Sequence, residues 1–140
     1  MPIGHYNEGM SQSPLPRQLF ENVGIGVDVA DIGRFTKLNR RTDRHFLNRL
    51  FTRQELRYCF SRATAAPHLA ARFAAKEAAI KALAMLNVRV SDWRELEVKR
   101  QKSGAPQLIL PKQLGVGARI SISHDQNIAI AVVIIFRHAV

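Results

Sequence analysis

The stretch FAAKEAAIKA, residues 73 to 82, constrains the fold more than any other part of this sequence. It predicts an amphipathic helix, because apolar residues recur there at spacings of three, four and seven. Pro67 is a favourable residue for the start of this helix, which we expect to end near Asn87. The residues of the expected apolar stripe are Leu69, Phe73, Ile80 and Ala84.

Two charged residues lie at the margins of this stripe. With about 100° per residue and Leu69 at zero, Glu77 lies at about 80° and Lys76 at about 340°. Both side chains therefore border a face that must pack on the rest of the protein. The helix thus raises the question of what this carboxylate and this ammonium group do.

The segments around the helix predict its neighbours. VGIGVDV, residues 23 to 29, indicates a strand that ends at Asp28, and its two glycines suit a backbone that passes close to another element. Thr42 and Asp43 indicate a helix start, and Thr52 with Glu55 forms a capping-box pattern for a helix to about Ser61. The second half predicts strands at 94–100, 106–110, 118–123 and 128–136, the last two as a hairpin through residues 124–127.

This order of elements favours an α+β fold, in which the helices pack on a mainly antiparallel sheet and the long helix is central. A chain of 140 residues with 46% hydrophobic residues has the size of one ordinary domain. Residues 1–21 lack periodicity, so we interpret them as a flexible extension and residues 22–140 as a single domain.

The cysteine content and the longest apolar run bear on localisation. Cys59 is the only cysteine, which excludes an intramolecular disulfide and a Cys-rich zinc site and fits a reducing compartment. There is no signal-like segment, and the longest apolar run, residues 128–136, is too short to span a bilayer. We therefore expect a cytoplasmic protein that does not bind or span a membrane.

Asp28 and Glu77 are candidate metal ligands. Asp28 lies at the end of the expected glycine-bearing strand, and Glu77 lies at the margin of a helix stripe that must face the sheet. Mg²⁺ commonly uses one or two carboxylates together with substrate phosphates. The alternative is that each carboxylate forms a salt bridge with a neighbouring Arg or Lys.

Several cations surround these carboxylates. Arg72, Lys76 and Lys81 lie on both sides of the stripe and are placed to grip a polyanion. The alternative is that these long side chains extend from a buried face to water. His124, at the end of the strand SISH, is a candidate phosphate donor or proton carrier, although a lone histidine on a loop is more often merely exposed.

The charge of the chain indicates an anionic partner. With 21 Lys and Arg against 11 Asp and Glu, the net charge is +10, which suits nucleic acid, an acidic protein or a phosphate-rich small molecule. A basic segment follows the first strand, and it forms one face if a helix persists through Arg41. The residues of that face are Arg34, Lys37, Leu38, Arg41 and Arg44.

The motifs in combination resemble the holo-(acyl-carrier-protein) synthase family of 4′-phosphopantetheinyl transferases. They are GIGVDVADIGR (24–34), RFAAKEAAIKA (72–82), GAPQL (104–108) and SISHDQNIAIAVV (121–133). The resemblance covers roughly residues 23 to 136. It implies a 4′-phosphopantetheinyl transferase-like fold and Mg²⁺-dependent transfer of 4′-phosphopantetheine from coenzyme A to a serine of an apo acyl carrier protein, with release of adenosine 3′,5′-bisphosphate.

The resemblance also implies roles for individual residues. Asp28 and Glu77 hold Mg²⁺ and are catalytic together with Lys76, while Lys81 and Lys76 attend the diphosphate. Arg72 and His124 are candidates for the 3′-phosphate, and Ser123 and Pro106 lie at the coenzyme A site, Pro106 in a turn near the adenine. The acidic carrier protein docks on Arg34, Leu38, Arg41 and Arg44.

Similarity further suggests a homotrimer with active sites between subunits. Two features depart from the family pattern, namely the extension at residues 1–21 and the segment 86–89, where Asn87 replaces a glycine-rich turn. That second departure keeps open a non-catalytic relative that only binds carrier protein. A basic nucleic-acid-binding domain is the other alternative, but it gives Glu77 and Asp28 no role and the chain offers few aromatics for base stacking, so we expect no nucleic-acid partner.

Overall fold

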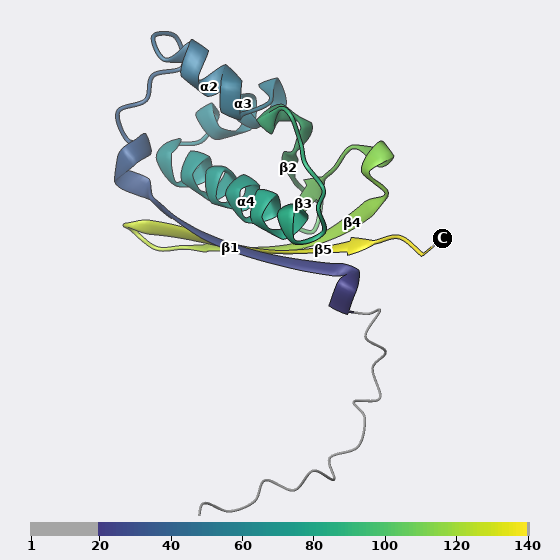
Figure 1. Ribbon diagram of the computed structural model, residues 1–140. Coiled ribbons are helices and arrows are strands. Elements are labelled where there is room, and N and C mark those ends of the chain that lie inside the picture. Colours follow the sequence, from purple (N-terminus) through teal and green to yellow (C-terminus); the bar gives the residue numbers. More distant parts are fainter. Residues whose placement is uncertain (1–19, 140) are drawn as a thin grey trace, which may run out of the picture.

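The computed structural model describes residues 20–139, so residues 1–19 of the expected extension lie outside the described part. Figure 1 shows one long helix lying across a sheet, with shorter helices and a hairpin above it. The strands are β1 (Val23–Asp31), β2 (Glu97–Arg100), β3 (Pro106–Ile109), β4 (Val116–His124) and β5 (Ile128–Arg137). The helices are α2 (Arg44–Leu50), α3 (Arg53–Phe60) and α4 (Ala66–Met85), with 3-10 turns η1 (Ile32–Phe35), η2 (Trp93–Glu95) and η3 (Lys112–Leu114).

The described strands form two antiparallel units. The larger sheet has the order β1-β5-β4, with β5 in the centre, and β2 pairs with β3 in a separate hairpin. The expected α+β architecture with a central helix is therefore confirmed. The two turns differ in chemistry, because Gly104 between β2 and β3 has a φ of 89°, whereas Asp125 Oδ1 accepts the backbone N–H groups of Asn127 and Ile128 between β4 and β5.

Helix α4 lies unusually close to β1, and two glycines permit this approach. A Cβ atom on Gly24 would lie 2.0 Å from the carbonyl oxygen of Ala82, and one on Gly26 would lie 1.8 Å from that of Ala78. Because strand faces alternate by two residues and helix turns by about four, the same face of β1 next presents Asp28 to the middle of α4. The glycine-bearing strand thus determines where its carboxylate meets the helix.

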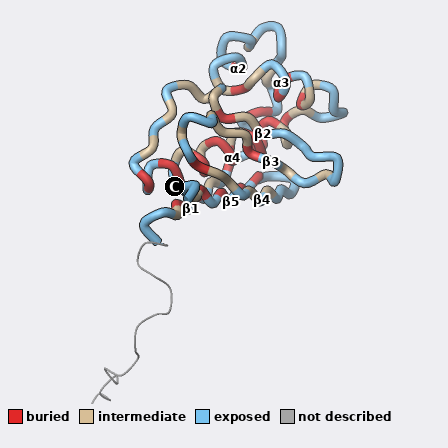
Figure 2. Tube along the Cα trace, turned by 90° about the vertical axis from the view of Figure 1, so that its right-hand side faces the viewer, coloured by how far each residue is buried: buried red, intermediate tan, exposed pale blue. Residues whose placement is uncertain are grey.

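Much of α4 is buried, as its red segments in Figure 2 show, and its buried side consists mainly of alanines. The expected stripe is only partly buried, since Phe73 and Ile80 are half-buried and Ala84 is exposed. This differs from the prediction because close packing on the sheet requires small side chains, which the stripe does not supply. The buried alanines are Ala66, Ala70, Ala71, Ala74, Ala75, Ala78, Ala79 and Ala82.

The expected basic helix after β1 is wrong beyond Phe35. Only the short turn η1 forms, and residues 36–43 are turns and irregular backbone. The side chain of Asn39 accepts the backbone N–H groups of Arg41 and Thr42, and Asp43 accepts that of Asn39. Such local side-chain bonds compete with helical backbone bonds, so Arg34, Leu38, Arg41 and Arg44 do not share one helix face.

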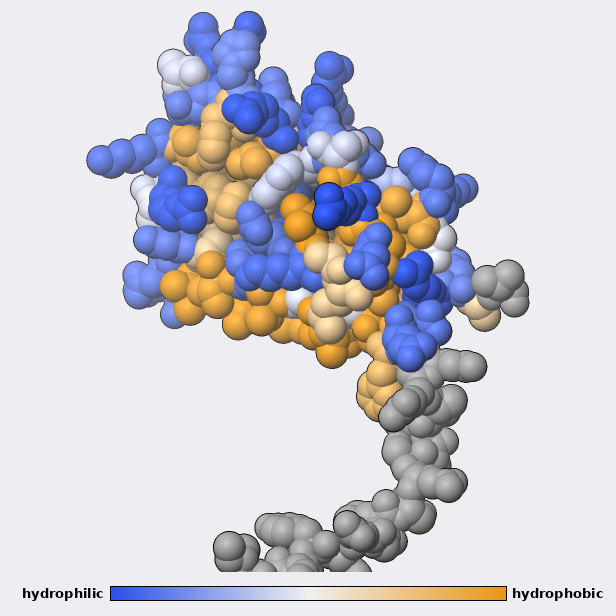
Figure 3. Space-filling view, in the orientation of Figure 1, coloured by the Kyte–Doolittle hydropathy of each residue, from blue (hydrophilic) through white to orange (hydrophobic). Residues whose placement is uncertain are grey.

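Helix α4 covers one face of the large sheet (Figure 1). The opposite face carries exposed aliphatic residues. Hydrophobic atoms also run along the lower edge of the molecule in Figure 3, where this sheet lies. No helix in the described part of the chain has the length and apolar character that crossing a membrane requires. The exposed aliphatic residues of the outer face are Ile25, Val27, Val29, Ile128, Ile130, Val132 and Ile134.

Candidate active site

Asp28 and Glu77 face each other beside Lys81, and we call these three residues the carboxylate cluster. Lys81 Nζ lies 3.0 Å from Asp28 Oδ1 and also donates to the carbonyl oxygen of Val27 at 3.0 Å. Glu77 lies one helical turn before Lys81, so all three side chains meet on one side of α4. The predicted convergence of the two carboxylates is thus seen, and one of them also forms the salt bridge of the alternative interpretation.

The electrostatics of the cluster suit a divalent cation. Partial burial raises the pKa of Glu77, the negative charge of Asp28 raises it further, and Lys81 opposes this only in part. Two carboxylates that repel each other are stabilised by a cation between them. Within residues 20–139, no group of three or more His, Cys, Asp or Glu residues is arranged so that it could hold a metal ion, so this site offers two protein carboxylates. That donor set fits Mg²⁺, which keeps water or substrate phosphates as its other ligands.

Lys76 does not reach this cluster, and the expectation that it attends a diphosphate is not supported by its position. Its ammonium group is fully buried and lies 2.7 Å from Glu55 Oε2. It also donates to the carbonyl oxygens of Leu50 and Trp93. Lys76 therefore ties α4 to the start of α3 and to η2, and its role in this structure is to position these elements.

Glu55 is the partner that makes this burial possible. The predicted capping box is confirmed, since Thr52 and Glu55 exchange side-chain and backbone hydrogen bonds at the start of α3. Glu55 Oε1 also accepts the backbone N–H of Val98 at 2.8 Å. A buried ion pair whose remaining hydrogen-bonding capacity is used in this way is tolerated in a protein interior.

A second group of polar residues lies on another side of α4, and we call Tyr58, Arg62, Arg72 and Arg100 the arginine cluster. The guanidinium of Arg72 lies 4.2 Å from the centre of the Tyr58 ring, and Nη2 of Arg62 and Nη1 of Arg100 each donate to the Tyr58 hydroxyl at 3.1 Å. None of these arginines forms a salt bridge among residues 20–139. Nε of Arg72 is buried and lacks a hydrogen-bond partner within the described residues.

The arginine cluster has the electrostatics of an anion site. Partial burial would raise the pKa of Tyr58, but the hydrogen bonds from Arg100 and Arg62 outweigh this and bring the pKa below its ordinary value. The ring of His68 lies 5.6 Å from that of Tyr58 and 6.5 Å from that of His124. Burial and the charge of Arg72 lower the pKa of His68, as expected where positive charge is in excess.

The other predicted coenzyme A residues are divided between locations. Pro106 pairs with Arg100 across the β2–β3 hairpin, which places it beside the arginine cluster. His124 ends β4 near His68, as described above. Ser123 pairs with Ile130 and shares the outer face of the sheet with it, so the structure does not bring Ser123 to Arg72 within one chain.

The carboxylate cluster and the arginine cluster are separate within one chain. On α4, Arg72 and Glu77 point about 140° apart. Asp28 and His124 lie on the two outer strands of the β1-β5-β4 sheet, so two strand spacings of roughly 4.8 Å each separate them. A ligand that uses both clusters must span this distance or receive one cluster from another copy of the chain.

Between the two clusters, the side of α4 that carries Phe73 leads to an apolar cavity. Arg34 lies over the ring of Phe73 at 5.6 Å, and Phe73 stacks on Trp93 with centroids 5.4 Å apart. A cavity of about 390 Å³ adjoins Trp93 one turn beyond Glu77. Its lining includes Ile80, Leu83, Ala84, Val88, Arg89 and Val90.

The segment after α4 keeps a normal helix end despite its lack of glycine. Asn87 has a φ of 56°, the only positive φ of a non-glycine residue among residues 20–139. The backbone N–H of Val88 donates to Leu83 and that of Asn87 donates to Ala84, which is the Schellman pattern of a left-handed helix cap. Asn87 thus takes the turn conformation that glycine usually supplies.

Comparison with known proteins decides the family. The sequence model of the 4′-phosphopantetheinyl transferase superfamily matches residues 24–133. The holo-[acyl-carrier-protein] synthase of Thermodesulfovibrio yellowstonii is 41% identical over 114 residues, which cover 80% of this chain and 96% of that protein. The enzyme of Geotalea daltonii is 38% identical with the same coverage. The chain belongs to the holo-(acyl-carrier-protein) synthase family of 4′-phosphopantetheinyl transferases.

Solved structures of holo-(acyl-carrier-protein) synthases share this fold. The Helicobacter pylori enzyme in complex with coenzyme A is 30% identical, with a TM-score of 0.67 over 79% of this chain and 98% of that chain. The Bacillus anthracis enzyme in complex with CoA (3′,5′-ADP) is 27% identical, with a TM-score of 0.67 over 82% and 96%. Family membership implies that this enzyme transfers phosphopantetheine from coenzyme A to an apo acyl carrier protein.

Sequence reasoning missed four residues of this synthase that the structure brings to the candidate site. Tyr58, Arg62 and Arg100 join Arg72 from α3, the loop after it and β2, and Trp93 covers Phe73. The spacing of four residues between Tyr58 and Arg62 fits a local contact, but the contacts of Tyr58 with Arg72 and Arg100 join distant segments and leave no signal in the sequence spacing. The local excess of arginine over acidic residues was the only available indication.

Proposed function

We propose that this enzyme transfers 4′-phosphopantetheine from coenzyme A to a serine of an apo acyl carrier protein in an Mg²⁺-dependent reaction, with release of adenosine 3′,5′-bisphosphate. The serine oxygen forms a bond to the β-phosphorus, the diphosphate bond to the adenosine 3′,5′-bisphosphate breaks, and the hydroxyl proton leaves. The observation that carries this proposal is the presence of two half-sites of opposite charge, the carboxylate cluster and the arginine cluster, around one helix.

Asp28 and Glu77 would hold Mg²⁺ beside the diphosphate, because two carboxylates that repel each other favour a cation between them. When bound, the ion neutralises the negative charge that grows on the leaving phosphate. Lys81 is half-exposed at the same place and is able to leave Asp28 for a phosphate oxygen. Glu77, or a water molecule beside it, accepts the proton of the serine.

The arginine cluster would bind the 3′-phosphate. Arg62 and Arg100 already donate to one oxygen, the Tyr58 hydroxyl, and the buried Nε of Arg72 still lacks an acceptor. A phosphate supplies acceptors for several such donors at once. His124 adds a donor when it is protonated, and Pro106 borders the same place, which suits the adenine. The apolar cavity beside Trp93 suits the pantetheine arm, because it begins one turn after Glu77.

The outer face of the sheet would hold copies of this chain together. Seven exposed aliphatic residues on β1 and β5 form a surface that water-soluble monomers seldom expose. We propose a homotrimer in which the carboxylate cluster of one copy and the arginine cluster of the next form one site. This assembly accounts for the separation of the two clusters, and it gives Ser123 on the outer face a neighbouring copy to contact.

The acidic carrier protein would dock near η1 and α2. Arg34 projects at the aromatic side of α4, Leu38 is half-buried against the core, and Arg41 and Arg44 line one open hollow with Arg40. Phe46 on α2 is 48% exposed and supplies an apolar contact among these cations. Charge of this kind mainly steers and orients an acidic partner.

Intact-protein mass spectrometry tests the proposal. The protein is mixed with apo acyl carrier protein, coenzyme A and Mg²⁺, with an EDTA control. We expect the carrier to gain one phosphopantetheine, and EDTA to stop the gain. A folded protein that modifies none of several carriers would contradict the transferase, whereas carrier binding without transfer would indicate a non-catalytic relative.

A further inference from the structure

His68 lies beside the arginine cluster, and the proposed reaction leaves it without a role. It belongs to the first turn of α4, and its side chain is half-buried. Its ring meets the ring of Tyr58 edge-on with centroids 5.6 Å apart, and the ring of His124 lies 6.5 Å away. His68 thus stands between the tyrosine that holds two arginines and the histidine that is a candidate for the 3′-phosphate.

The ring of His68 has unused hydrogen-bonding capacity. Neither ring nitrogen has a hydrogen-bond partner among residues 20–139, whereas the backbone carbonyl of His68 accepts Nη1 of Arg72 at 3.5 Å. The guanidinium of Arg72 therefore turns back along α4 toward His68. Nε of Arg72 is buried and likewise lacks a partner in the described part of the chain. Adjacent polar groups without acceptors indicate a ligand that brings oxygen atoms.

The charge around His68 is one-sided. No carboxylate of residues 20–139 forms a salt bridge with it, and Asp125, which follows His124, uses Oδ1 to cap the turn between β4 and β5. Burial lowers the pKa of His68, and the positive charges among its neighbours lower it further, so the ring is neutral near pH 7. The titratable and charged groups that face it are Tyr58 on α3, Arg62 after α3, Arg72 on α4, Arg100 on β2 and His124 at the end of β4.

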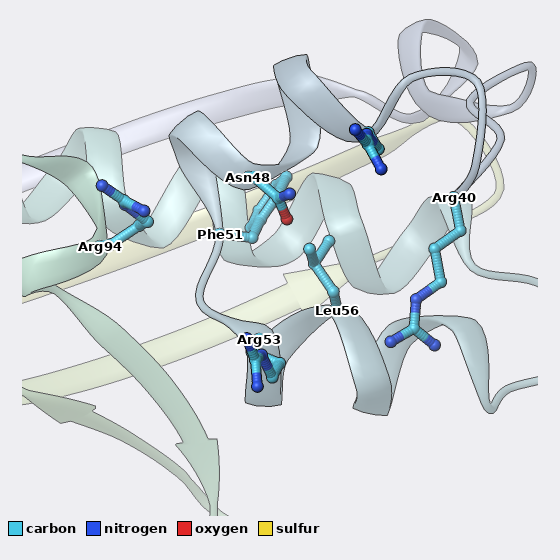
Figure 4. Close-up of a pocket in the computed structure, with 7 residues that line it drawn as sticks. Arg40, Asn48, Phe51, Arg53, Leu56 and Arg94 are labelled. Atoms are coloured by element: carbon cyan, nitrogen blue, oxygen red, sulfur yellow. The ribbon is translucent and has the colours of Figure 1, made fainter.

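An excess of arginine alone does not make such a site, as another group of arginines shows. Figure 4 shows Arg40, Arg53 and Arg94 around a pocket between α2, α3 and η2. These arginines lie apart from one another, with apolar side chains between them. In the arginine cluster, by contrast, two arginines meet at the hydroxyl of Tyr58 and a titratable ring adjoins them. The surroundings of His68 therefore suit one compact anion.

We propose that His68 is a further ligand of the 3′-phosphate, and that its imidazole changes from neutral to protonated when this phosphate binds. The inference rests on the proposed function, in which the arginine cluster receives that phosphate. The arriving phosphate offsets part of the positive charge that keeps the ring neutral, and one of its oxygens accepts a hydrogen bond from the imidazolium. The proton comes from the solvent, so binding of coenzyme A takes up a proton at His68.

This coupling fixes the direction of the pH dependence. Because the phosphate raises the pKa of His68 in the complex above that of the free protein, the gain in affinity from His68 is complete below the pKa of the free protein. It is lost as the pH rises through the pKa of the complex. His68 thus favours ligands with a 3′-phosphate most strongly at mildly acidic pH.

Nuclear magnetic resonance of the wild-type protein tests this directly. The Cε1–H signals of His68 and His124 are titrated with pH, first without ligand and then with saturating adenosine 3′,5′-bisphosphate. We expect the pKa of His68 to rise by about one unit or more in the complex. Adenosine 5′-phosphate, which lacks the 3′-phosphate, should leave it unchanged. A His68 signal that titrates identically with and without adenosine 3′,5′-bisphosphate would overturn the inference.

The variant His68→Phe gives a second readout, because it keeps an aromatic ring against Tyr58 but cannot carry a proton. By isothermal titration calorimetry, its affinity for adenosine 3′,5′-bisphosphate should be about tenfold below that of the wild type at pH 6, which corresponds to one pKa unit, and within about twofold at pH 8.5. Comparison with the wild type at each pH removes the ionisation of the phosphate itself. His45→Phe is the matched control, since His45 is an exposed histidine on α2, and it should change the affinity at neither pH.

The possible failures are distinguishable. An equal loss of affinity in His68→Phe at both pH values would show that the ring only packs on Tyr58. If adenosine 3′,5′-bisphosphate still binds more tightly than adenosine 5′-phosphate in that case, the assignment of His68 alone has failed. If the two ligands bind equally or not at all, the arginine cluster is not a 3′-phosphate site, and that part of the proposed function is contradicted together with the inference.

Discussion

The carboxylate cluster and the arginine cluster lie on one helix but have opposite character. In the first, partial burial and the negative charge of Asp28 raise the pKa of Glu77, and one cation, Lys81, lies beside the two carboxylates. In the second, three arginines surround a tyrosine without any salt bridge among residues 20–139. The first therefore carries an excess of negative charge and the second an excess of positive charge. Each is therefore suited to a different part of one ligand, a metal-bound diphosphate and a further phosphate.

The largest expected effect is at the carboxylate cluster. Glu77→Gln keeps the shape of the side chain but removes a charge that the bound metal ion requires. We expect kcat/KM for transfer to fall by about 10³-fold or more. The rate of carrier modification in the mass-spectrometric assay measures this. A variant that retains a tenth of the wild-type rate would show that Glu77 is not a metal ligand.

Lys76 should belong to neither cluster, and its removal should affect stability. Lys76→Met leaves Glu55 buried without its partner, so we expect a loss of about 3–5 kcal/mol in the free energy of unfolding by urea. Lys81→Met, on the same helix but half-exposed, should change it by about 1 kcal/mol or less. Similar stabilities for the two variants would contradict the buried ion pair.

The arginine cluster should contribute only to binding of the 3′-phosphate. Arg72→Gln should raise the KM for coenzyme A by about 10- to 100-fold, the range for a charge-assisted hydrogen bond, and should leave kcat nearly unchanged. With 3′-dephospho-coenzyme A as substrate, the same variant should behave like the wild type. An equal rise in KM for both substrates would place Arg72 elsewhere on the ligand.

A smaller effect concerns pH and the stability of the metal-free protein. Because the folded pKa of Glu77 is raised, its contribution to stability is present below the unfolded pKa and is lost as the pH rises through the folded pKa. In EDTA at pH 7, Glu77→Gln should thus raise Tm slightly. Glu95→Gln is the contrasting variant, since hydrogen bonds from Ser91 and Asp92 lower the pKa of Glu95 and its loss should lower Tm. A lower Tm for Glu77→Gln would contradict the repulsion between the carboxylates.

The sequence predicted the parts of this structure that depend on local rules. The Thr52 and Glu55 pair gave the start of α3, and the alternating segments gave the strands. The approach of Asp28 to Glu77 was also predictable, because the glycine-bearing strand and the long helix must pack on each other, although β1 continues to Asp31 and does not end at Asp28 as expected. The cap and the strands need only neighbouring residues in the chain, whereas the meeting of Asp28 and Glu77 follows from the packing of the strand on the helix.

The failures arise where side chains from distant segments compete. The helical wheel placed Lys76 at the edge of a half-buried helix, but α3, η2 and the sheet bury α4 on several sides. The missing basic helix is the exception, because it is lost to local hydrogen bonds of the Asn39 and Asp43 side chains with backbone N–H groups two to four residues away. The arginine cluster depends on α3, α4 and β2 meeting in space, and no spacing in the sequence shows this.

Mixing two variants that are each impaired at low coenzyme A concentration tests the central claim, that the two clusters of different copies form one site. Glu77→Gln and Arg72→Gln are refolded together and assayed at a coenzyme A concentration well below its KM. If neighbouring copies share the site, roughly a quarter of the sites regain both clusters, and the rate should recover to about that fraction of the wild type. If native mass spectrometry shows mixed oligomers and the rate stays at the level of the separate variants, one chain supplies the whole site and the account is contradicted.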